Sequence, residues 1–341
     1  MKRTAIDRRT QKLAWASGLP WKVAKARVQA LAAHQPLIAE ASRDQAVLEC
    51  HFLHALARPR CTTLHPWGIR SVAASTSRLV VTFETVQSNR GEGDDETTVL
   101  GLMRAVLPLG GDSGDVYGIA GARLRVEDGT VVLRRFGLNA AIQLDGFAPH
   151  AVQAAAMRVA DEARQDGMAP CQQESPERWH ACEREYMRRG TTDWYETLMA
   201  TSAWLPSGLL RRAPLLRAVG IPLSTTAWTD ADPYGPGELW KVDQEHFEPQ
   251  AGSGVSHHRP FIAMLTDPEC GMPLALEHEA CRCATGRCDD CRVYLRSHGR
   301  PGRLEMRFTR RADFYLERAQ STVFEFERRR RLYRRLPATF R

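Results

Sequence analysis

This sequence of 341 residues lacks long apolar runs. None of its segments approaches the roughly 20 consecutive apolar residues that a membrane-spanning helix needs. Residues 1–9 carry the positive charge of a signal peptide, but the apolar segment that normally follows such a charge is missing. We therefore expect a cytoplasmic protein that does not enter a membrane. Hydrophobic residues make up 43% of the chain, which is the proportion of an ordinary globular protein.

Sequence motifs of common enzyme classes are also missing. The chain has no phosphate-binding loop, dinucleotide fingerprint, nucleophile elbow or zincin motif. Lysine is scarce, and Lys241, the only lysine after residue 25, closely follows Asp230 and Asp232. Acidic side chains beside a lysine can hold a metal ion that activates water. A metal-dependent hydrolase in the Asp230–His258 region is therefore an alternative, and the sequence leaves open whether the protein is an enzyme.

Cysteine, in contrast, is concentrated near the C-terminus. Four of the nine cysteines lie within eleven residues, in the pattern C-x-C-x4-C-x2-C: Cys281, Cys283, Cys288 and Cys291. The others are scattered and show no disulfide spacing: Cys50, Cys61, Cys171, Cys182 and Cys270. In a reducing compartment, clustered thiols are more often metal ligands than disulfide partners. The last two thiols have the usual zinc spacing, either of the first two could complete the site, and His278 is an alternative fourth ligand.

Part of this cluster has a second interpretation. Cys283-Ala-Thr-Gly-Arg-Cys288-Asp-Asp-Cys291 resembles the C-x-x-G-x-C-x-x-C loop of plant-type ferredoxins. The resemblance covers nine residues and implies that three thiolates bind a [2Fe–2S] cluster. The fourth cysteine of that family lies downstream of the loop, whereas no cysteine follows Cys291 here, so Cys281 would have to replace it. The two aspartates of the loop add negative charge, which would disfavour reduction of the cluster.

Positive charge is concentrated at both ends of the chain. Residues 1–28 carry eight basic side chains and one acid, and residues 301–341 carry twelve arginines and five acids, which gives +7 at each end. The overall charge is also +7, so the middle of the chain is acidic. Basic terminal segments suit a polyanion, most simply nucleic acid. A long helix is expected over Ala312–Leu336, with four arginines placed to contact phosphates: Arg328, Arg329, Arg330 and Arg331.

The segment Gln11–Leu31 has the outline of a helix-turn-helix. Residues 17–20 (Ser-Gly-Leu-Pro) interrupt two helical patterns, and the proline fits the first turn of the second helix. In this arrangement Ala24, Val28 and Leu31 would pack inward. A plain helical hairpin is the alternative. The basic residues of the second helix would face outward, where a recognition helix meets DNA: Lys22, Lys25 and Arg27.

Changes in periodicity divide the chain into four segments of a multi-domain α+β fold. Helical spacing predicts a helical unit over residues 1–64, and β-branched runs with turn signals predict a β-rich unit over 65–149. Helical patterns return over 150–218 and include a helix expected to start at Ser175. Region 219–341 combines the cysteine cluster, as a metal knuckle, with the long basic helix. Its first part is rich in proline and glycine and shows no clear pattern.

These features favour a DNA-binding protein with a structural zinc knuckle and a role in regulation or in maintaining a replicon. Two other classes of protein fit the same residues. One is a metalloenzyme or an iron–sulfur protein. The other is an assembly protein whose basic ends bind a protein partner. Visible colour would identify an iron–sulfur cluster, and a salt-dependent shift on DNA would separate nucleic-acid binding from protein assembly.

Overall fold

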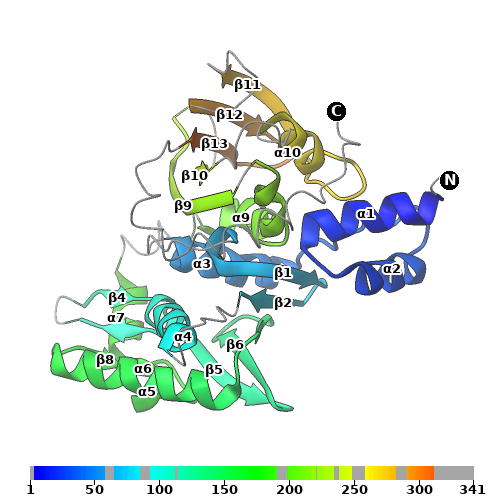
Figure 1. The fold of residues 1–341 in the computed structure, drawn as a ribbon. Helices are drawn as coiled ribbons and strands as arrows, with labels where there is room; N and C mark the ends of the chain where they lie inside the picture. The colour runs from blue at the N-terminus through cyan, green and yellow to red at the C-terminus, as the bar shows by residue number, and fades with distance from the viewer. Residues whose placement is uncertain are drawn as a thin grey trace.

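The fold of this protein, seen in a computed structural model, combines several helices with several sheets and so confirms the α+β class (Figure 1). Among the described residues, no helix is both long and apolar enough to cross a bilayer. The expected basic helix lies outside these residues, and the predicted domain boundaries stay predictions. The structure describes residues 4–57, 65–84, 93–111, 114–189, 197, 199–219, 221–233, 238–247, 258–281 and 290–310.

Three helices open the chain: α1 (Ala5–Ser17), α2 (Trp21–Ala30) and α3 (Arg43–Ala57). Helix α1 begins at a capping box in which Thr4 and Asp7 exchange hydrogen bonds. It ends at Gly18, which has the left-handed φ of 71°. A Cβ atom at Gly18 would lie 2.3 Å from the carbonyl oxygen of Arg70, so the turn between α1 and α2 requires glycine. The two helices predicted around this turn are therefore present.

The first large sheet has five strands in the order β1-β2-β7-β6-β5. They are β1 (Ile69–Ala74), β2 (Arg78–Phe83), β5 (Ala122–Glu127), β6 (Thr130–Arg135) and β7 (Ala141–Asp145). A short 3-10 turn, η1 (Pro66–Gly68), precedes β1. Strands β2 and β7 are parallel, and the other neighbours are antiparallel. The β5–β6 hairpin turns at Asp128 and Gly129, which both have positive φ, as expected for a tight hairpin.

A second group of elements packs beside this sheet. It contains α4 (Gly93–Val106), β3 (Leu109–Gly110), β4 (Val116–Tyr117), α5 (Pro149–Gln165), β8 (Ala169–Pro170), α6 (Cys171–Glu174) and α7 (Ala181–Arg188). Helices α4 and α5 pack together, and β3 lies between β4 and β8 in a small sheet. The helix expected to start at Ser175 starts instead at Ala181. The reason is Arg123, which binds the carbonyl oxygens of Ser175 and Arg178 and holds that segment out of a helix.

The second large sheet has five strands in the order β11-β12-β13-β10-β9. They are β9 (Ile221–Ala231), β10 (Glu238–Phe247), β11 (Ala275–Cys281), β12 (Asp290–Arg296) and β13 (Arg303–Arg310). Strands β10 and β13 are parallel, and the other neighbours are antiparallel. Three helical segments accompany this sheet: α9 (Trp204–Leu210), η2 (Ala213–Ala218) and α10 (His258–Leu265).

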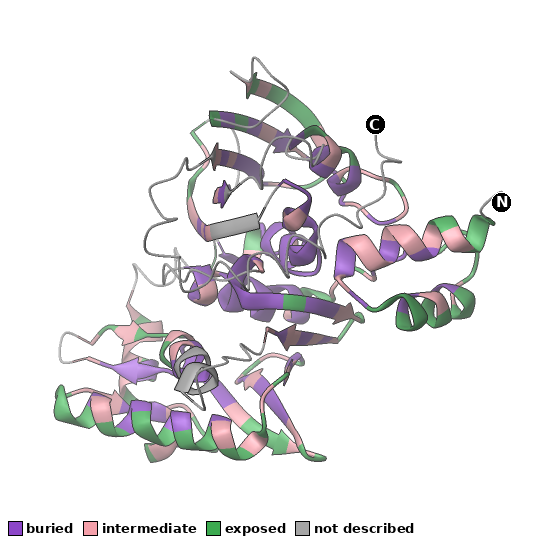
Figure 2. Cartoon of the chain, in the orientation of Figure 1, coloured by how far each residue is buried: buried purple, intermediate pink, exposed green. Residues whose placement is uncertain are grey.

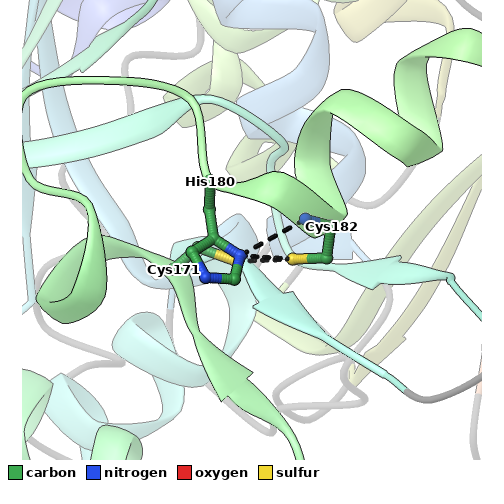
Figure 3. Close-up of side chains that lie close together, drawn as sticks. All are labelled: Cys171, His180 and Cys182. Carbon is green, nitrogen blue, oxygen red and sulfur yellow. Dashed lines mark hydrogen bonds between the residues drawn. The ribbon is translucent and has the colours of Figure 1, made fainter.

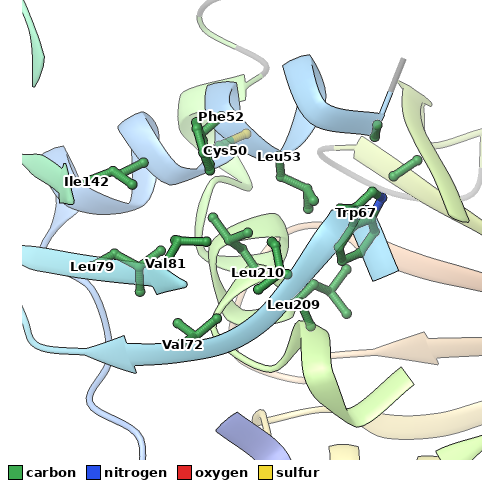
Figure 4. Close-up of a cluster of buried hydrophobic side chains, with 14 of the residues drawn as sticks. Cys50, Phe52, Leu53, Trp67, Val72, Leu79, Val81, Ile142, Leu209 and Leu210 are labelled. Carbon is green, nitrogen blue, oxygen red and sulfur yellow. The ribbon is translucent and has the colours of Figure 1, made fainter. Parts of the chain in front are cut away.

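Helix α3 lies between the two large sheets and contacts β7 of the first and β9 of the second (Figure 1). It is buried on almost every side, as a central helix must be. Figure 4 shows Phe52 and Leu53 of α3 close to apolar side chains of β1, β2 and α9. Most of the buried apolar residues that the structure describes form one connected cluster, which runs from Leu13 to Phe308. The core is therefore shared by the N-terminal helices and both large sheets.

Candidate metal centres

Two clusters of cysteine and histidine could each hold a metal ion, and they lie in different parts of the fold. In each cluster the ligand atoms lie within 4.8 Å of one another. Cysteine and histidine side chains of this kind are usual zinc ligands. The two groups are the Cys281 cluster, formed by His258, Cys281 and Cys291, and the Cys171 cluster, formed by Cys171, His180 and Cys182.

Strands β11 and β12 bring the two thiols of the Cys281 cluster together. Cys281 and Cys291 are direct partners in the antiparallel ladder, and their Sγ atoms are 3.3 Å apart. Two of the four predicted cysteine ligands therefore lie side by side. The other two, Cys283 and Cys288, belong to the connection 282–289, which lies outside the described residues.

The histidine of this cluster is His258, the first residue of α10. It is 1% exposed, and its ring stacks on Phe308 with 5.9 Å between the ring centroids. Its Nε2 atom lies 2.7 Å from Oε1 of Glu279 in β11. Burial lowers the pKa of His258, and Glu279 opposes this effect. A carboxylate on one ring nitrogen commonly orients the other nitrogen toward a metal ion, so Nδ1 would be the ligand atom in a loaded site.

His278, the fourth ligand suggested by the sequence, lies in β11 but is not part of this cluster. Its side chain is exposed and lies beside Tyr294, with 6.0 Å between the ring centroids. Successive side chains of a strand point to opposite faces of the sheet. Because Glu279 faces His258, its neighbour His278 faces away from the cluster. The histidine beside the two thiols is therefore His258.

The Cys171 cluster lies where β8, α6 and α7 meet (Figure 3). Cys171 begins α6, His180 is the N-cap of α7, and Cys182 lies in the first turn of α7. The Sγ atoms of the two cysteines are 3.2 Å apart, and Nδ1 of His180 is 2.9 Å from Sγ of Cys182. On the other side of the ring, Nε2 lies 3.0 Å from Oε2 of Glu174. Both clusters thus combine two thiols, one imidazole and one carboxylate on that imidazole.

A buried ion pair fixes the loop that carries these ligands. The guanidinium of Arg123 in β5 and the carboxylate of Glu183 in α7 are 2.8 Å apart and almost fully buried. Arg123 also donates to the carbonyl oxygens of Ser175 and Arg178. Glu183 accepts a hydrogen bond of 2.7 Å from the backbone N–H of His180. The position of His180 is therefore set by the same ion pair that holds the loop on the first large sheet.

Burial affects the acidity of the first thiol of this cluster. It raises the pKa of Cys171 well above the usual range of a thiol, and the nearby Cys182 adds to the rise. Without a cation, this side chain therefore stays protonated near neutral pH. A bound metal ion would displace that proton, because metal ligands of this kind are thiolates.

The sequence pointed to His258 only as the end of the region suggested for a hydrolase, not as a ligand beside Cys281, and it did not point to the Cys171 cluster. Residues 171–182 contain the pattern C-x8-H-x-C, in which the two thiols are too far apart to read as a zinc knuckle. His258 lies far from Cys281 in the chain and reaches it only because α10 packs on the second large sheet. For the Cys171 cluster, the only local signal in the sequence is the pair His180 and Cys182, which are separated by one residue.

The acids of the region suggested for a hydrolase form ion pairs instead. Lys241 of β10 and Asp230 of β9 form an ion pair, with 2.5 Å between Nζ and Oδ2. Asp232 lies 3.3 Å from Arg303 of β13. Within the described part of the chain, neither acid belongs to a group that could hold a metal ion. The first ion pair joins the neighbouring strands β9 and β10, and the second joins the residue after β9 to β13 on the far side of β10.

The three basic residues of α2 differ in their surroundings. Lys22 and Arg27 are exposed and have no ion-pair partner among the described residues, whereas Lys25 lies 3.5 Å from Asp7 of α1. Two of the three side chains are therefore available to an anionic ligand. The four arginines predicted to contact phosphates near the C-terminus lie outside the described residues: Arg328, Arg329, Arg330 and Arg331.

The function of the chain has to be argued from these residues. None of the candidate sites matches a catalytic motif in the sequence. Comparison with known proteins does not add to this picture, since no family model, curated protein or solved structure matches the chain.

Proposed function

We propose that this protein binds nucleic acid, which we expect to be duplex DNA, through the outward face of helix α2. The composition of this face carries the proposal. Residues of an α-helix follow one another at about 100° around the axis. Ala24 and Val28 are buried against the rest of the protein. The opposite side of the helix therefore carries five exposed residues: Lys22, Val23, Ala26, Gln29 and Ala30.

This face has the shape and chemistry that a DNA groove accepts. Three of its five residues are small or short and apolar, so the helix backbone can approach the base edges closely. Lys22 and Gln29 supply donors and an acceptor for phosphates and bases. The main contacts of α2 are with α1. Figure 2 shows α2 at the edge of the molecule, largely in the colour of exposed residues.

The charge of α2 also favours a polyanion. The helix contains no acidic residue, and no side chain caps its N-terminus at Pro20. Lys22 therefore adds a positive charge at the positive end of the helix dipole, which is unfavourable for the isolated protein. A phosphate group at this position would be stabilised by both the lysine and the backbone N–H groups. Arg27, which has no acidic partner in the described chain, would add a second phosphate contact.

The Cys281 cluster would bind Zn²⁺ and stabilise the C-terminal region. In this proposal Cys281, Cys291 and His258 are ligands, and Cys283 or Cys288 completes the tetrahedron. The metal would join α10 to the end of the β11–β12 hairpin where the connection 282–289 links the two strands, so its role is structural. The basic helix predicted after this sheet would bring further arginines to the same DNA. The C-terminal region would then consist of a metal knuckle followed by a basic extension.

Substitution of the two exposed cations of α2 tests the proposal. We expect Lys22→Ala and Arg27→Ala each to weaken binding to duplex DNA and to reduce the salt dependence of log K by about one unit per lost phosphate contact. The free energy of unfolding should stay within about 0.5 kcal/mol of the parent, as for most surface changes. Arg164→Ala, on the exposed surface of α5, is the matched control and should bind DNA like the parent. Unchanged binding by both α2 variants would contradict the proposal.

One observation favours a different partner. Ile6, Trp21 and Val23 of the α1–α2 hairpin are 43%, 46% and 45% exposed, and large exposed apolar side chains often mark protein interfaces. An assembly protein would use these residues rather than Lys22. Trp21→Ser should then abolish capture of the protein partner, while Lys22→Ala leaves that capture and any DNA binding unchanged. If Lys22→Ala weakens DNA binding and Trp21→Ser does not affect the capture of any protein, the result supports DNA binding.

A further inference from the structure

We propose that Cys171, His180 and Cys182 form a second metal centre, which binds Zn²⁺ independently of the Cys281 cluster. The two sites belong to different sheets. Cys171 follows strand β8 of the small sheet, whereas Cys281 and Cys291 lie in strands β11 and β12 of the second large sheet. The centre is therefore additional to the zinc knuckle of the proposed function, and neither site depends on the other.

The distances between the donor atoms are close to those of a tetrahedral zinc site. With Zn–S bonds of about 2.3 Å and Zn–N bonds of about 2.0 Å, two sulfurs lie about 3.8 Å apart and a sulfur and a nitrogen about 3.5 Å. The observed separations are 3.2 Å between the sulfurs and 2.9 Å from Nδ1 of His180 to Sγ of Cys182. Both are shorter by about 0.6 Å, so small side-chain rotations would admit the ion.

The environment of His180 fits metal ligation through Nδ1. Oε2 of Glu174 lies 3.0 Å from Nε2, where a carboxylate would hold the ring proton and leave the lone pair on Nδ1 for a metal ion. The backbone N–H of Cys182 points to the same Nδ1 at 3.4 Å, as it would to an unprotonated nitrogen. This lone pair faces the two sulfurs (Figure 3). The carboxylate, imidazole and thiols are thus in the order that carboxylate–histidine–zinc sites show.

The surrounding chain holds the three donors in place. The buried pair of Arg123 and Glu183 fixes the loop between α6 and α7, and Glu183 binds the backbone of His180 directly. On the other side, Gly110 of β3 lies so close that an added Cβ atom would be 2.2 Å from Sγ of Cys182. A rigid site of this kind loses little entropy when the ion binds. Among the described residues the site has three protein ligands, so an exogenous donor such as water would take the fourth position.

Zinc content of the full-length protein tests this centre separately from the Cys281 cluster. Cys182→Ser and His180→Ala should each lose about one equivalent of zinc per chain relative to the parent. Cys270→Ser, which also alters a buried cysteine, should lose none. Cys291→Ser should lose the metal of the other cluster and keep this one. Unchanged zinc in both Cys182→Ser and His180→Ala would overturn the proposal.

Alkylation of the unmodified protein gives an answer even if the variants do not fold. We expect Zn²⁺, added back after chelation, to protect the partly exposed Cys182 from iodoacetamide, because a zinc-bound thiolate reacts poorly. Cys270 provides the internal control, since zinc should not alter its rate of reaction. Equal alkylation of Cys182 with and without zinc would refute the site. A disulfide between Cys171 and Cys182 in protein purified with a reductant would also refute it.

Discussion

At the scale of single residues, Glu238 shows how this fold uses buried polar groups. The residue lies in β10 and is fully buried. Its Oε2 atom accepts hydrogen bonds from Ser202 Oγ at 2.5 Å and Trp240 Nε1 at 2.6 Å. Burial raises the pKa of Glu238 from 4.5 to about 7, although both hydrogen bonds act against this rise. The folded protein therefore favours the protonated carboxyl more than the unfolded chain does.

This shift predicts a specific pH dependence of stability. A raised pKa in the folded state means that the contribution of Glu238 is complete below pH 4.5 and is lost as the pH rises through about 7. Glu238→Gln keeps an uncharged side chain that can accept the same hydrogen bonds. Between pH 5 and pH 8, we expect the stability of this variant relative to the parent to increase by about 1–3 kcal/mol. Urea denaturation at the two pH values measures the change.

A surface glutamate serves as the control for this measurement. Glu127 is paired with Arg134, whose hydrogen bond lowers the pKa of Glu127 below 4.5. Because that pKa is lowered, the contribution of Glu127 is lost only as the pH falls below this range, and it is constant from pH 5 to pH 8. Glu127→Gln should therefore show the same difference from the parent at both pH values. A constant difference for Glu238→Gln as well would contradict the account of the buried carboxyl.

At the scale of elements, the turn between α1 and α2 decides the geometry of the proposed DNA-binding hairpin. Gly18 has a φ of 71°, and a Cβ atom there would meet the backbone of Arg70. Gly18→Ala should therefore lower the free energy of unfolding by about 1–3 kcal/mol. Gly101→Ala in α4 should do the opposite and stabilise by about 0.5–1 kcal/mol, because its Cβ atom would meet nothing within 4 Å. Thermal or urea unfolding of the two variants should give changes of opposite sign, and equal changes would refute this explanation.

Elements with a regular apolar pattern could be predicted from the sequence. The α1–α2 helices follow from their spacing around residues 17–20, and the β5–β6 hairpin follows from its Asp-Gly turn. Strand β10 could not be predicted, because it buries Glu238, Gln244 and His246 where a strand pattern calls for apolar residues. The start of α7 was predicted wrongly, because Arg123 captures the backbone of the preceding segment and no local signal reveals a contact from β5.

The candidate sites also divide into those that the sequence could predict and those that depend on packing between distant elements. Cys281 and Cys291 could be found because thiols that are close in sequence are brought together by a hairpin. His258 and the Cys171 cluster depend on how α10 and α7 pack on other elements, which sequence spacing does not encode. The exposed position of Lys22 follows directly from helical periodicity, whereas Arg27 is exposed at the flank of the helix beside the buried Val28.

At the scale of the whole molecule, one core joins the N-terminal helices to both large sheets. At its centre, Glu49 of α3 binds Arg211 at 2.7 Å, and both side chains are buried. Ser207 and Gln45 donate further hydrogen bonds to the same carboxylate. A buried pair that is this fully satisfied specifies one arrangement of α3 and α9. The basic N-terminal hairpin is therefore attached to a rigid body, which suits a recognition element.

The C-terminal arginines belong to the same account of DNA binding. Deletion of residues 328–341 should weaken binding to duplex DNA, with a loss that grows as salt is lowered, because phosphate contacts are lost. The melting temperature should not change. Replacing the four consecutive arginines by glutamine keeps the apolar residues of the segment and should weaken binding in the same way. A truncated protein with a lower melting temperature and unchanged DNA affinity would show that this segment stabilises the fold instead.

Binding of the unmodified full-length protein to a duplex of random sequence is the most direct test of the central claim. Measured by fluorescence anisotropy between about 50 and 200 mM salt, log K should fall linearly with log salt, with a slope of about −2 or steeper if Lys22 and Arg27 both contact phosphates. No binding at the lowest salt, or an affinity that does not depend on salt, would contradict the claim that this protein binds nucleic acid.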